Sequence, residues 1–346
     1  MGATKTGEMM SPELMKDILP LTSEMKNTVE LSSNNIKDII SGKNNRIILI
    51  IGPCSADYIE SLLTYSEFLK ELRKKVKDKI EIVMRFYTGK PRTIGGWKGK
   101  MHSAPGEKSN LGNGIYECRE MALKIIDNGI PIADEMLNAH MTPYVDDIFS
   151  YIAVGARSTE DQYHREVASG LDVAVGMKNP TSGNIEIMTN SVRAAQIPSH
   201  YKMRKGLYDS TGNEYTHGIL RGGYVTGPNY RSKYIKEYIK NSNGIINPTL
   251  IIDASHDNCL TNGKKDPLTQ IKVIREVLTQ IIPELIENGY DVKNLIKGFM
   301  VESYIFDGNQ KYIDEKNIIK GKSFTDPCIG LENTEKLVMD LYKNLD

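Results

Sequence analysis

Short apolar runs alternate with longer amphipathic stretches along most of the chain. Eight of these runs are rich in Val, Ile or Leu, which is typical of strands buried on both faces. They cover residues 46–52, 79–87, 130–136, 151–156, 173–179, 217–222, 249–254 and 297–303. The pattern therefore predicts eight buried strands.

The stretches between the runs predict helices. Helical patterns cover residues 57–77, 159–170, 184–196, 266–282 and 332–345. Strands separated by helices pair in parallel through right-handed crossovers. Eight such units over about 250 residues match an α/β protein with a (β/α)8 TIM barrel. An open doubly wound sheet usually has fewer strands and a Gly-rich turn after the first, whereas Gly52-Pro53-Cys54-Ser55 follows the first run here.

Two segments do not fit a bare barrel. Residues 1–45 precede the first strand and predict a mostly helical extension, with a role in oligomerisation or regulation. Residues 46–346 form the predicted barrel domain. Within it, residues 198–217 are polar and Tyr-rich where the fifth helix should lead into the sixth strand. We expect an inserted β-hairpin there, with Ser210-Thr211-Gly212-Asn213 as its turn.

Composition narrows the class of partner. The chain has 346 residues, with 44 Lys and Arg against 44 Asp and Glu, so its net charge is zero. This balance indicates neither nucleic acid nor an anionic membrane as a partner. The sequence has no run of about 18 apolar residues and no secretory signal, and its four cysteines are dispersed. We expect a cytoplasmic protein that acts on small molecules.

Four predicted strand ends or following loops carry metal-ligand side chains. In a TIM barrel the active site forms at the carboxyl ends of the strands. Cys54 follows the first strand, His256 the seventh and Glu302 ends the eighth, while Asp326 lies in the loop beyond. These ligands suit a borderline divalent cation such as Mn²⁺, Fe²⁺, Co²⁺ or Zn²⁺. Singly, each also has an ordinary structural interpretation, as with a buried cysteine; their joint position favours the metal.

A second group at the same strand ends is cationic. Its members are Arg85, Lys90, Arg92, Arg157, Lys178 and Arg221. Such a cluster repels itself unless anions enter the cleft, and Arg binds phosphate and carboxylate in a bidentate manner. We therefore expect small, highly anionic substrates. One or two of these cations should pair with an acidic neighbour instead, most obviously Glu135.

Together, these residues resemble the microbial class I synthases of 3-deoxy-D-arabino-heptulosonate 7-phosphate (DAHP), the first enzymes of the shikimate pathway. Six motifs carry the resemblance, in order and at compatible spacing, from about residue 15 to the end. They are Gly52-Pro53-Cys54-Ser55, Lys90-Pro91-Arg92-Thr93, Gly155-Ala156-Arg157-Ser158-Thr159-Glu160, Leu220-Arg221-Gly222-Gly223, Asp253-Ala254-Ser255-His256 and Lys322-Ser323-Phe324-Thr325-Asp326.

The resemblance implies the substrates and the residues that bind them. It implies a metal-dependent, aldol-like condensation of phosphoenolpyruvate with erythrose 4-phosphate. The metal ligands would be Cys54, His256, Glu302 and Asp326. Phosphoenolpyruvate would bind Arg85, Lys90, Ala156, Arg157, Lys178 and Arg221. Erythrose 4-phosphate would bind Pro91, Arg92, Thr93 and Asp326.

Four of these residues are expected to take part in catalysis. Cys54 and His256 would act through the metal, which polarises the aldehyde oxygen. Lys90 is the expected proton donor to that oxygen, and its burial among Arg residues should favour its neutral form. Glu135 should orient either the attacking water or a cationic side chain.

Regulation and assembly follow from the resemblance only in outline. In members of this kind, the extension, the hairpin and the fifth-strand region commonly form a pocket for an inhibitory aromatic amino acid. The equivalent surface here includes Asp172, Tyr201 and Met203, and the extension is short, so the effector stays open. A homodimer or homotetramer is expected.

Two other functions are weighed against this one. A 3-deoxy-octulosonate 8-phosphate synthase, which uses a pentose phosphate, would share the metal site but carry a different motif in place of Lys90-Pro91-Arg92-Thr93. A non-catalytic sensor built on the barrel would show degenerate metal ligands, whereas all four ligand types are present here.

Overall fold

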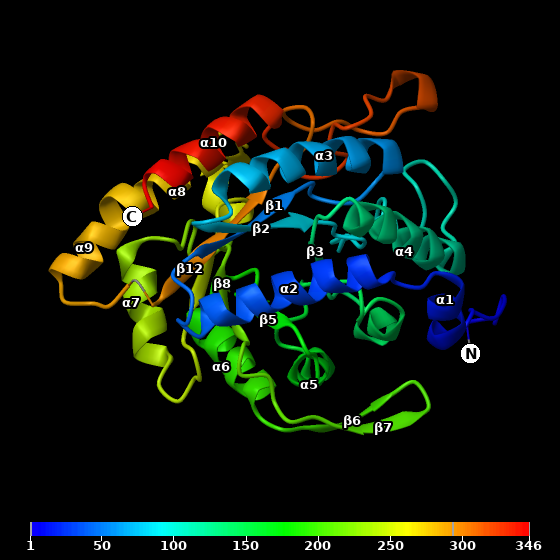
Figure 1. Cartoon of the computed structure of the whole chain (residues 1–346), viewed down its shortest axis with the longest axis horizontal. Helices are drawn as coiled ribbons and strands as arrows, with labels where there is room; N and C mark the ends of the chain where they lie inside the picture. The colour runs from blue at the N-terminus through cyan, green and yellow to red at the C-terminus, as the bar shows by residue number, and fades with distance from the viewer. Residues whose placement is uncertain (1, 293, 346) are drawn as a thin grey trace.

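The computed structural model describes residues 2–292 and 294–345 and contains a closed barrel of eight parallel strands (Figure 1). Around the barrel the strands follow the order β1-β12-β9-β8-β5-β4-β3-β2. Their bounds are β1 Ile47–Gly52, β2 Ile80–Arg85, β3 Ile132–Glu135, β4 Tyr151–Val154, β5 Ala174–Lys178, β8 His217–Leu220, β9 Leu250–Asp253 and β12 Ile296–Glu302. The TIM barrel and all eight predicted strands are confirmed.

Helices surround the barrel. Those that follow the extension are α3 Ile59–Val76, α4 Leu111–Asp127, α5 Gln162–Ser169, α6 Ile185–Gln196, α7 Ser232–Asn241, α8 Thr269–Glu276, α9 Ile282–Glu287 and α10 Leu331–Lys343. The sequence pattern did not predict α4 and α7. The helix predicted over residues 266–282 is confirmed in the main, and a π-helical turn, Val277–Ile281, joins α8 to α9 within it. In the described chain, no helix is long and apolar enough to span a membrane.

Between β3 and β4 a 3₁₀ helix, η1 (Ala139–Tyr144), replaces the usual α-helix. Two further 3₁₀ turns are η2 (His256–Cys259) and η4 (Glu315–Asn317). A short hairpin, β10 (Leu260–Thr261) and β11 (Lys264–Lys265), directly follows η2. Of the polar side chains described below, His256 and Asp257 lie on η2 and Lys265 lies on β11.

The predicted helical extension consists of α1 (Pro12–Ile18) and α2 (Ser23–Ile40). Ser11 and Thr22 cap the two helices by accepting hydrogen bonds from backbone N–H groups of the first turn. The last turn of α2 packs its isoleucines against the inward-facing Ile48 and Ile50 of β1. The extension thus covers the end of the barrel where the strands begin, and the opposite end stays open.

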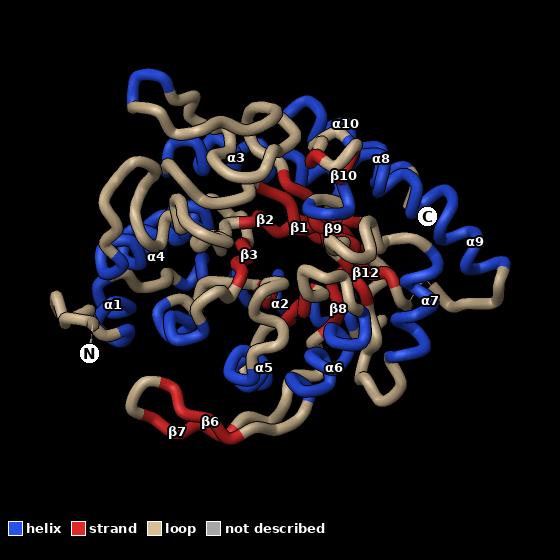
Figure 2. The backbone as a smooth tube through the Cα atoms, turned by 180° about the vertical axis from the view of Figure 1, so that it is seen from behind, coloured by secondary structure: helices blue, strands red, loops and turns tan. Residues whose placement is uncertain are grey.

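The inserted hairpin is confirmed, but its predicted turn is wrong. It consists of β6 (His200–Met203) and β7 (Gly206–Asp209), and it projects from the barrel beyond α5 and α6 (Figure 2). The chain reverses at Arg204 and Lys205, where Arg204 has a φ of 56°. Asn213 lies after β7, outside the turn. Its side-chain amide donates to the carbonyls of Ala168, Leu171 and Val173, and these bonds attach the base of the hairpin to the barrel.

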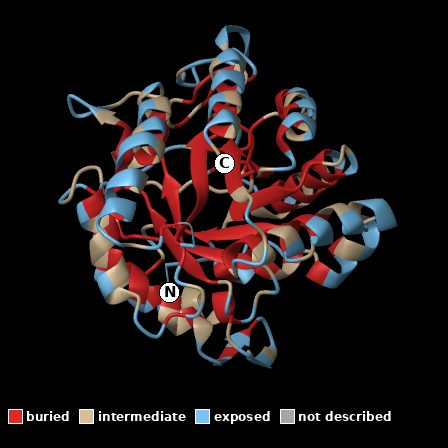
Figure 3. Ribbon diagram, turned by 60° about the vertical axis from the view of Figure 1, so that its left-hand side comes forward, coloured by how far each residue is buried: buried red, intermediate tan, exposed pale blue. Residues whose placement is uncertain are grey.

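The barrel strands are almost wholly buried (Figure 3). One charged residue on them, Glu81 of β2, joins the extension to the barrel. Its carboxylate accepts hydrogen bonds from Ser32 (2.8 Å) and Asn35 (3.2 Å) of α2. It also pairs with Arg46 (2.9 Å) and with Arg73 of α3 (2.8 Å). Since Glu81 is only 1% exposed, these four partners together replace its hydration.

Replacing Glu81 should destabilise the fold strongly. Glu81→Ala leaves two partly buried guanidinium groups and two α2 side chains without their acceptor. We expect a loss of about 3 kcal/mol in the free energy of unfolding, measured by urea denaturation followed by circular dichroism. Glu71→Ala is the control, because Glu71 is exposed and pairs with Lys74 one turn away. Equal unfolding midpoints for the two variants would contradict this role of Glu81.

Candidate active site

Three predicted metal ligands converge at the open end of the barrel. The Sγ of Cys54 and one carboxylate oxygen each of Glu302 and Asp326 lie within 4.8 Å of one another. Cys54 follows β1, Glu302 ends β12, and these two strands are paired, with Gly52 opposite Glu302. Asp326 arrives from the long loop after β12, and its Oδ2 lies 3.8 Å from Cys54 Sγ. A sulfur and two carboxylates within this distance fit one divalent cation.

His256, the fourth predicted ligand, lies beside this cluster. Its Nε2 is 3.9 Å from Glu302 Oε1, and its Nδ1 is 2.9 Å from Asp253 Oδ2. An imidazole held at one nitrogen by a carboxylate, with the other nitrogen facing a metal position, is the usual arrangement of a metal-binding histidine. His256 also has a φ of 55°, in the left-handed region, a strained conformation that occurs at functional sites.

Cations surround the acidic ligands. Arg85 Nη2 is 3.2 Å from Glu302 Oε1, while Asp326 Oδ2 lies 3.3 Å from Lys90 Nζ and 2.8 Å from Lys265 Nζ. Burial alone would raise the pKa of Glu302 and of Asp326, but His256 and these cations hold both pKa values well below their usual range. Burial raises the pKa of the Cys54 thiol to about 11. A bound cation would therefore have to displace the thiol proton.

Lys90 is not buried among Arg residues as expected. Its Nζ lies 2.7 Å from Cys54 Sγ as well as 3.3 Å from Asp326. Burial alone would lower the pKa of Lys90, but Cys54, Asp326 and Glu302 outweigh that effect and raise it above its usual value. The expectation of a neutral-favouring environment was therefore wrong, because the neighbours of Lys90 are the acidic metal ligands.

A buried charge network lies deeper in the barrel. Lys178 pairs with Glu135 at 2.8 Å and lies 3.7 Å from Asp253. The Arg85 guanidinium lies 3.8 Å and the Lys178 ammonium 5.3 Å from the centroid of the Tyr87 ring. Both distances are favourable for a cation–π interaction. Glu135 thus holds a cationic side chain in place, one of the two roles expected of it.

More of the six cations are paired than predicted. Arg221 pairs with Asp257 at 2.6 Å, so four of the six have carboxylate partners, not one or two. Gly222 makes this packing fit: its φ is 74°, and a Cβ there would lie 2.6 Å from the backbone of Asp257. Arg221 and Asp257 follow the neighbouring strands β8 and β9, whereas the pairs of Arg85 with Glu302 and of Lys178 with Glu135 each reach across one intervening strand.

In the part of the chain that the structure describes, Arg92 and Arg157 form no ion pair. Arg92 Nε donates to the carbonyl of Trp97 at 2.7 Å, and Arg157 Nη2 donates to Thr93 Oγ1 at 3.2 Å. Arg157 follows Ala156 in the turn after β4, while Arg92 and Thr93 lie in the loop after β2. These two guanidinium groups therefore remain available to an anion at the outer edge of the site.

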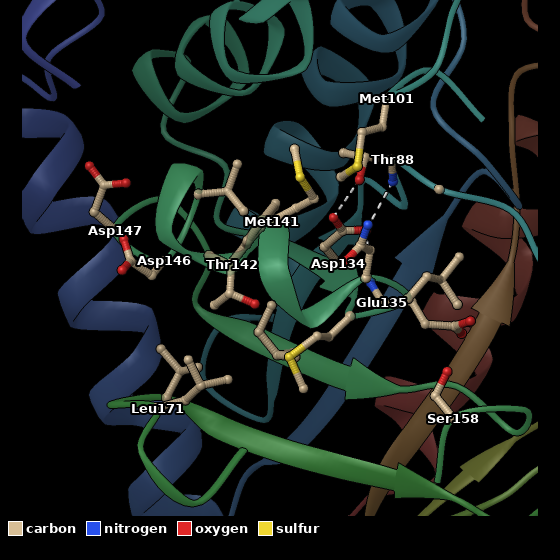
Figure 4. A pocket seen from close by; sticks show the side chains of 18 of the residues that line it. Thr88, Met101, Asp134, Glu135, Met141, Thr142, Asp146, Asp147, Ser158 and Leu171 are labelled. Carbon is tan, nitrogen blue, oxygen red and sulfur yellow. Dashed lines mark hydrogen bonds between the residues drawn. The ribbon is translucent and has the colours of Figure 1, made fainter. Parts of the chain in front are cut away.

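A cavity of about 1040 Å³ extends from this edge toward the extension (Figure 4). Lys90, Pro91 and Arg92 line one end, and the side of α2 lines the other. Met141 and Thr142 of η1 also line it. Asp134 of β3 lies in its wall and accepts hydrogen bonds from Thr88 N (2.9 Å) and Thr88 Oγ1 (2.7 Å). Asp134 thus anchors the segment that leads to Lys90.

The expected effector surface is divided. Asp172 lines the cavity and pairs with Lys37 of α2 at 2.7 Å. Tyr201 and Met203 lie on β6, outside the described lining of the cavity. Tyr201 stacks on Tyr208 with ring centroids 5.9 Å apart. The cavity and the aromatic face of the hairpin are therefore neighbouring but separate features.

Sequence reasoning missed four polar residues of this site: Asp134, Asp253, Asp257 and Lys265. Asp253 lies three residues before His256 in a motif that was recognised, so that spacing could have identified it. Asp257 adjoins His256 in the same way. Asp134 and Lys265 have no local signature, because their partners, Thr88 and Asp326, are far away in the sequence.

Comparisons with known proteins all point to the same family. The profile described as the DAHP synthetase I family matches residues 23–339. A Trp-sensitive phospho-2-dehydro-3-deoxyheptonate aldolase of Buchnera aphidicola is 37% identical over 334 residues, covering 94% of this chain and 92% of the relative. The Tyr-sensitive enzyme of that name from Escherichia coli is 35% identical over 346 residues, covering 98% of this chain and 93% of the relative.

A solved structure agrees with these matches. The phospho-2-dehydro-3-deoxyheptonate aldolase of Francisella tularensis superposes with a TM-score of 0.91 at 32% identity, covering 99% of this chain and 98% of that chain. The match extends over the extension and the hairpin as well as the barrel, since so little of either chain is left out. The chain therefore belongs to the DAHP synthetase I family.

Proposed function

We propose that this protein is a DAHP synthase, which condenses phosphoenolpyruvate with erythrose 4-phosphate to give DAHP and phosphate, the first step of the shikimate pathway. The observation that carries the proposal is the convergence of Cys54, Glu302 and Asp326, with His256 beside them, next to a cationic cleft. Two anionic substrates need such a cleft, because they would otherwise repel each other.

The reaction makes one carbon–carbon bond. Carbon 3 of phosphoenolpyruvate attacks the aldehyde carbon of erythrose 4-phosphate, water adds at carbon 2, and phosphate leaves by C–O cleavage. We assign Arg85, Lys178, Arg157 and Arg221, with the backbone at Ala156, to phosphoenolpyruvate. Their bidentate and point-charge contacts match its carboxylate and phosphate groups.

The phosphate of erythrose 4-phosphate is assigned to the outer edge. Arg92 and Thr93 belong to the loop after β2, with Pro91 shaping its start. Arg157 reaches the same point, because it donates to Thr93. Asp326 lies inward of this loop, beside Lys90. An aldose phosphate held at the outer edge would therefore extend its aldehyde toward Cys54, Lys90 and Asp326.

Cys54, His256, Glu302 and Asp326 fit a divalent cation such as Mn²⁺, Fe²⁺, Co²⁺ or Zn²⁺. When bound, such a cation supplies Lewis acidity toward the aldehyde oxygen. The Nζ of Lys90 lies 2.7 Å from Cys54 Sγ and 3.3 Å from Asp326 Oδ2. We assign it as the hydrogen-bond and proton donor to the developing alkoxide oxygen. Glu135 keeps Lys178 in place for phosphoenolpyruvate.

We further propose feedback inhibition by an aromatic amino acid, at the end of the cavity beside α2. The names of relatives as Trp-sensitive and Tyr-sensitive support this type of control. Asp172 and Lys37 offer opposite charges that match an amino acid's ammonium and carboxylate groups. The apolar wall beside them suits an aromatic ring; it includes Val29, Met141, Phe149 and Leu171.

We also propose an assembly and a location. A homodimer or homotetramer in the cytoplasm agrees with the family resemblance. Several large apolar side chains of the extension and hairpin are exposed in the single chain, as a subunit interface would require. They are Leu14, Ile18, Leu31, Leu207 and Tyr208.

Metal dependence tests the proposed reaction. Chelator-treated protein should consume phosphoenolpyruvate with erythrose 4-phosphate only after a divalent cation is restored, each candidate being added in turn. Cys54→Ala should show no turnover with any of them, because the thiolate ligand is lost. Cys118→Ala is the control, since Cys118 is a buried cysteine of α4 outside the cluster. Wild-type turnover by Cys54→Ala in metal-free buffer, or preference for a pentose phosphate, would contradict the proposal.

Inhibition tests the proposed effector site. Phenylalanine, tyrosine and tryptophan are titrated separately against the wild-type rate, and the concentration for half inhibition is recorded. Asp172→Asn should raise that concentration by about tenfold for the effective amino acid, because a charge-assisted hydrogen bond is lost. Asp340→Asn, which removes an exposed aspartate of α10 paired with Arg275, is the control. Unchanged inhibition of Asp172→Asn would place the effector elsewhere.

A further inference from the structure

A short hairpin links two of the loops that carry metal ligands. It begins directly after η2, whose first residue is His256. The backbone N–H of Asp266, just past the hairpin, bonds the carbonyl of Cys259 at 3.1 Å, which closes its base. From the base of the hairpin, where it pairs with Leu260, Lys265 reaches Asp326 Oδ2 at 2.8 Å. The hairpin therefore connects the segment of His256 to the loop of Asp326.

The turn of this hairpin fixes the direction of Lys265. Asn262 and Gly263 form the turn with φ values of 50° and 74°, the pair of positive angles that a two-residue type I′ turn requires. Leu260 pairs with Lys265, and Thr261 pairs with Lys264. Side chains alternate along a strand, so Lys264 is exposed while Lys265 is directed inward and only 26% of its side chain is exposed.

Asp326 depends on lysine contacts for its orientation. Its Oδ2 receives Lys265 at 2.8 Å and Lys90 at the longer distance of 3.3 Å. Lys90 is shared with Cys54 Sγ, at 2.7 Å. Among residues 2–292 and 294–345, the ammonium group of Lys265 has no such second ion-pair partner, and it makes the shorter bond. Of the two cations, Lys265 is therefore the one dedicated to holding the Asp326 carboxylate.

We propose that Lys265 is a positioning residue for the metal site, orienting the Asp326 carboxylate toward Cys54 and Glu302. The inference deepens the proposed function, because it rests on Asp326 being a metal ligand. Groups that orient a ligand in this way typically change metal affinity by about 10- to 100-fold when they are removed. The positive charge of Lys265 opposes this effect, since an ammonium group repels a nearby divalent cation. The two effects therefore predict opposite changes in affinity.

The test measures metal affinity rather than turnover. Apo-protein is titrated with Co²⁺ against a competing chelator, and the thiolate-to-cobalt absorption band reports occupancy of the Cys54 site. Lys265→Met should weaken Co²⁺ binding by about tenfold or more, and Lys265→Arg should recover part of the loss because it keeps a charged donor. Lys264→Met, which removes the outward lysine of the same strand, should bind Co²⁺ as the wild type does.

Separate outcomes overturn separate claims. Unchanged or tighter Co²⁺ binding by Lys265→Met would overturn the positioning role, and tighter binding would show that charge repulsion dominates. Melting temperatures of the apo-variants establish that each is folded, and Lys265→Gln replaces Lys265→Met if the latter is not. If the competing chelator shows that Cys54→Ala binds Co²⁺ as tightly as the wild type, the metal site itself is wrong and both proposals fall.

Discussion

The site depends on holding two acidic side chains, the fully buried Glu302 and the partly buried Asp326, beside the buried thiol of Cys54. Carboxylates so placed are unfavourable unless cations compensate them. Arg85, Lys90 and Lys265 supply that compensation in the absence of a metal. The same positive groups lie next to the position where an anionic substrate would approach. One set of charges thus serves both the metal ligands and the substrates.

The cations consequently divide into two layers. Inner ones are paired with acidic groups of the barrel, as Lys178 is with Glu135. Arg92 and Arg157, in the described chain, lack such partners and lie at the outer edge. An incoming phosphate meets the unpaired layer first, and its binding does not require a buried ion pair to break. The anchoring of Thr88 by Asp134 connects this edge to the cavity beside α2.

The sequence predicted the barrel well because strands buried on both faces are continuous apolar runs. It missed α4, whose first turn contains Gly112 and Gly114, and α7, whose Tyr and Lys residues blur the apolar face. Strand ends pointed to Cys54, Glu302 and Asp326, which the fold does bring within 4.8 Å of one another. The prediction for the surroundings of Lys90 was wrong because those surroundings depend on β1 lying between β2 and β12. The contact of Lys265 was missed because its partner, Asp326, lies in a loop more than sixty residues away.

The central claim is that one sulfur, one imidazole and two carboxylates bind a single cation. X-ray absorption fine structure of the zinc-loaded protein tests it most directly. The account predicts one sulfur neighbour at about 2.3 Å, with the remaining neighbours nitrogen or oxygen at about 2.0–2.2 Å. A first shell that contains only nitrogen and oxygen, or more than one sulfur, would contradict it.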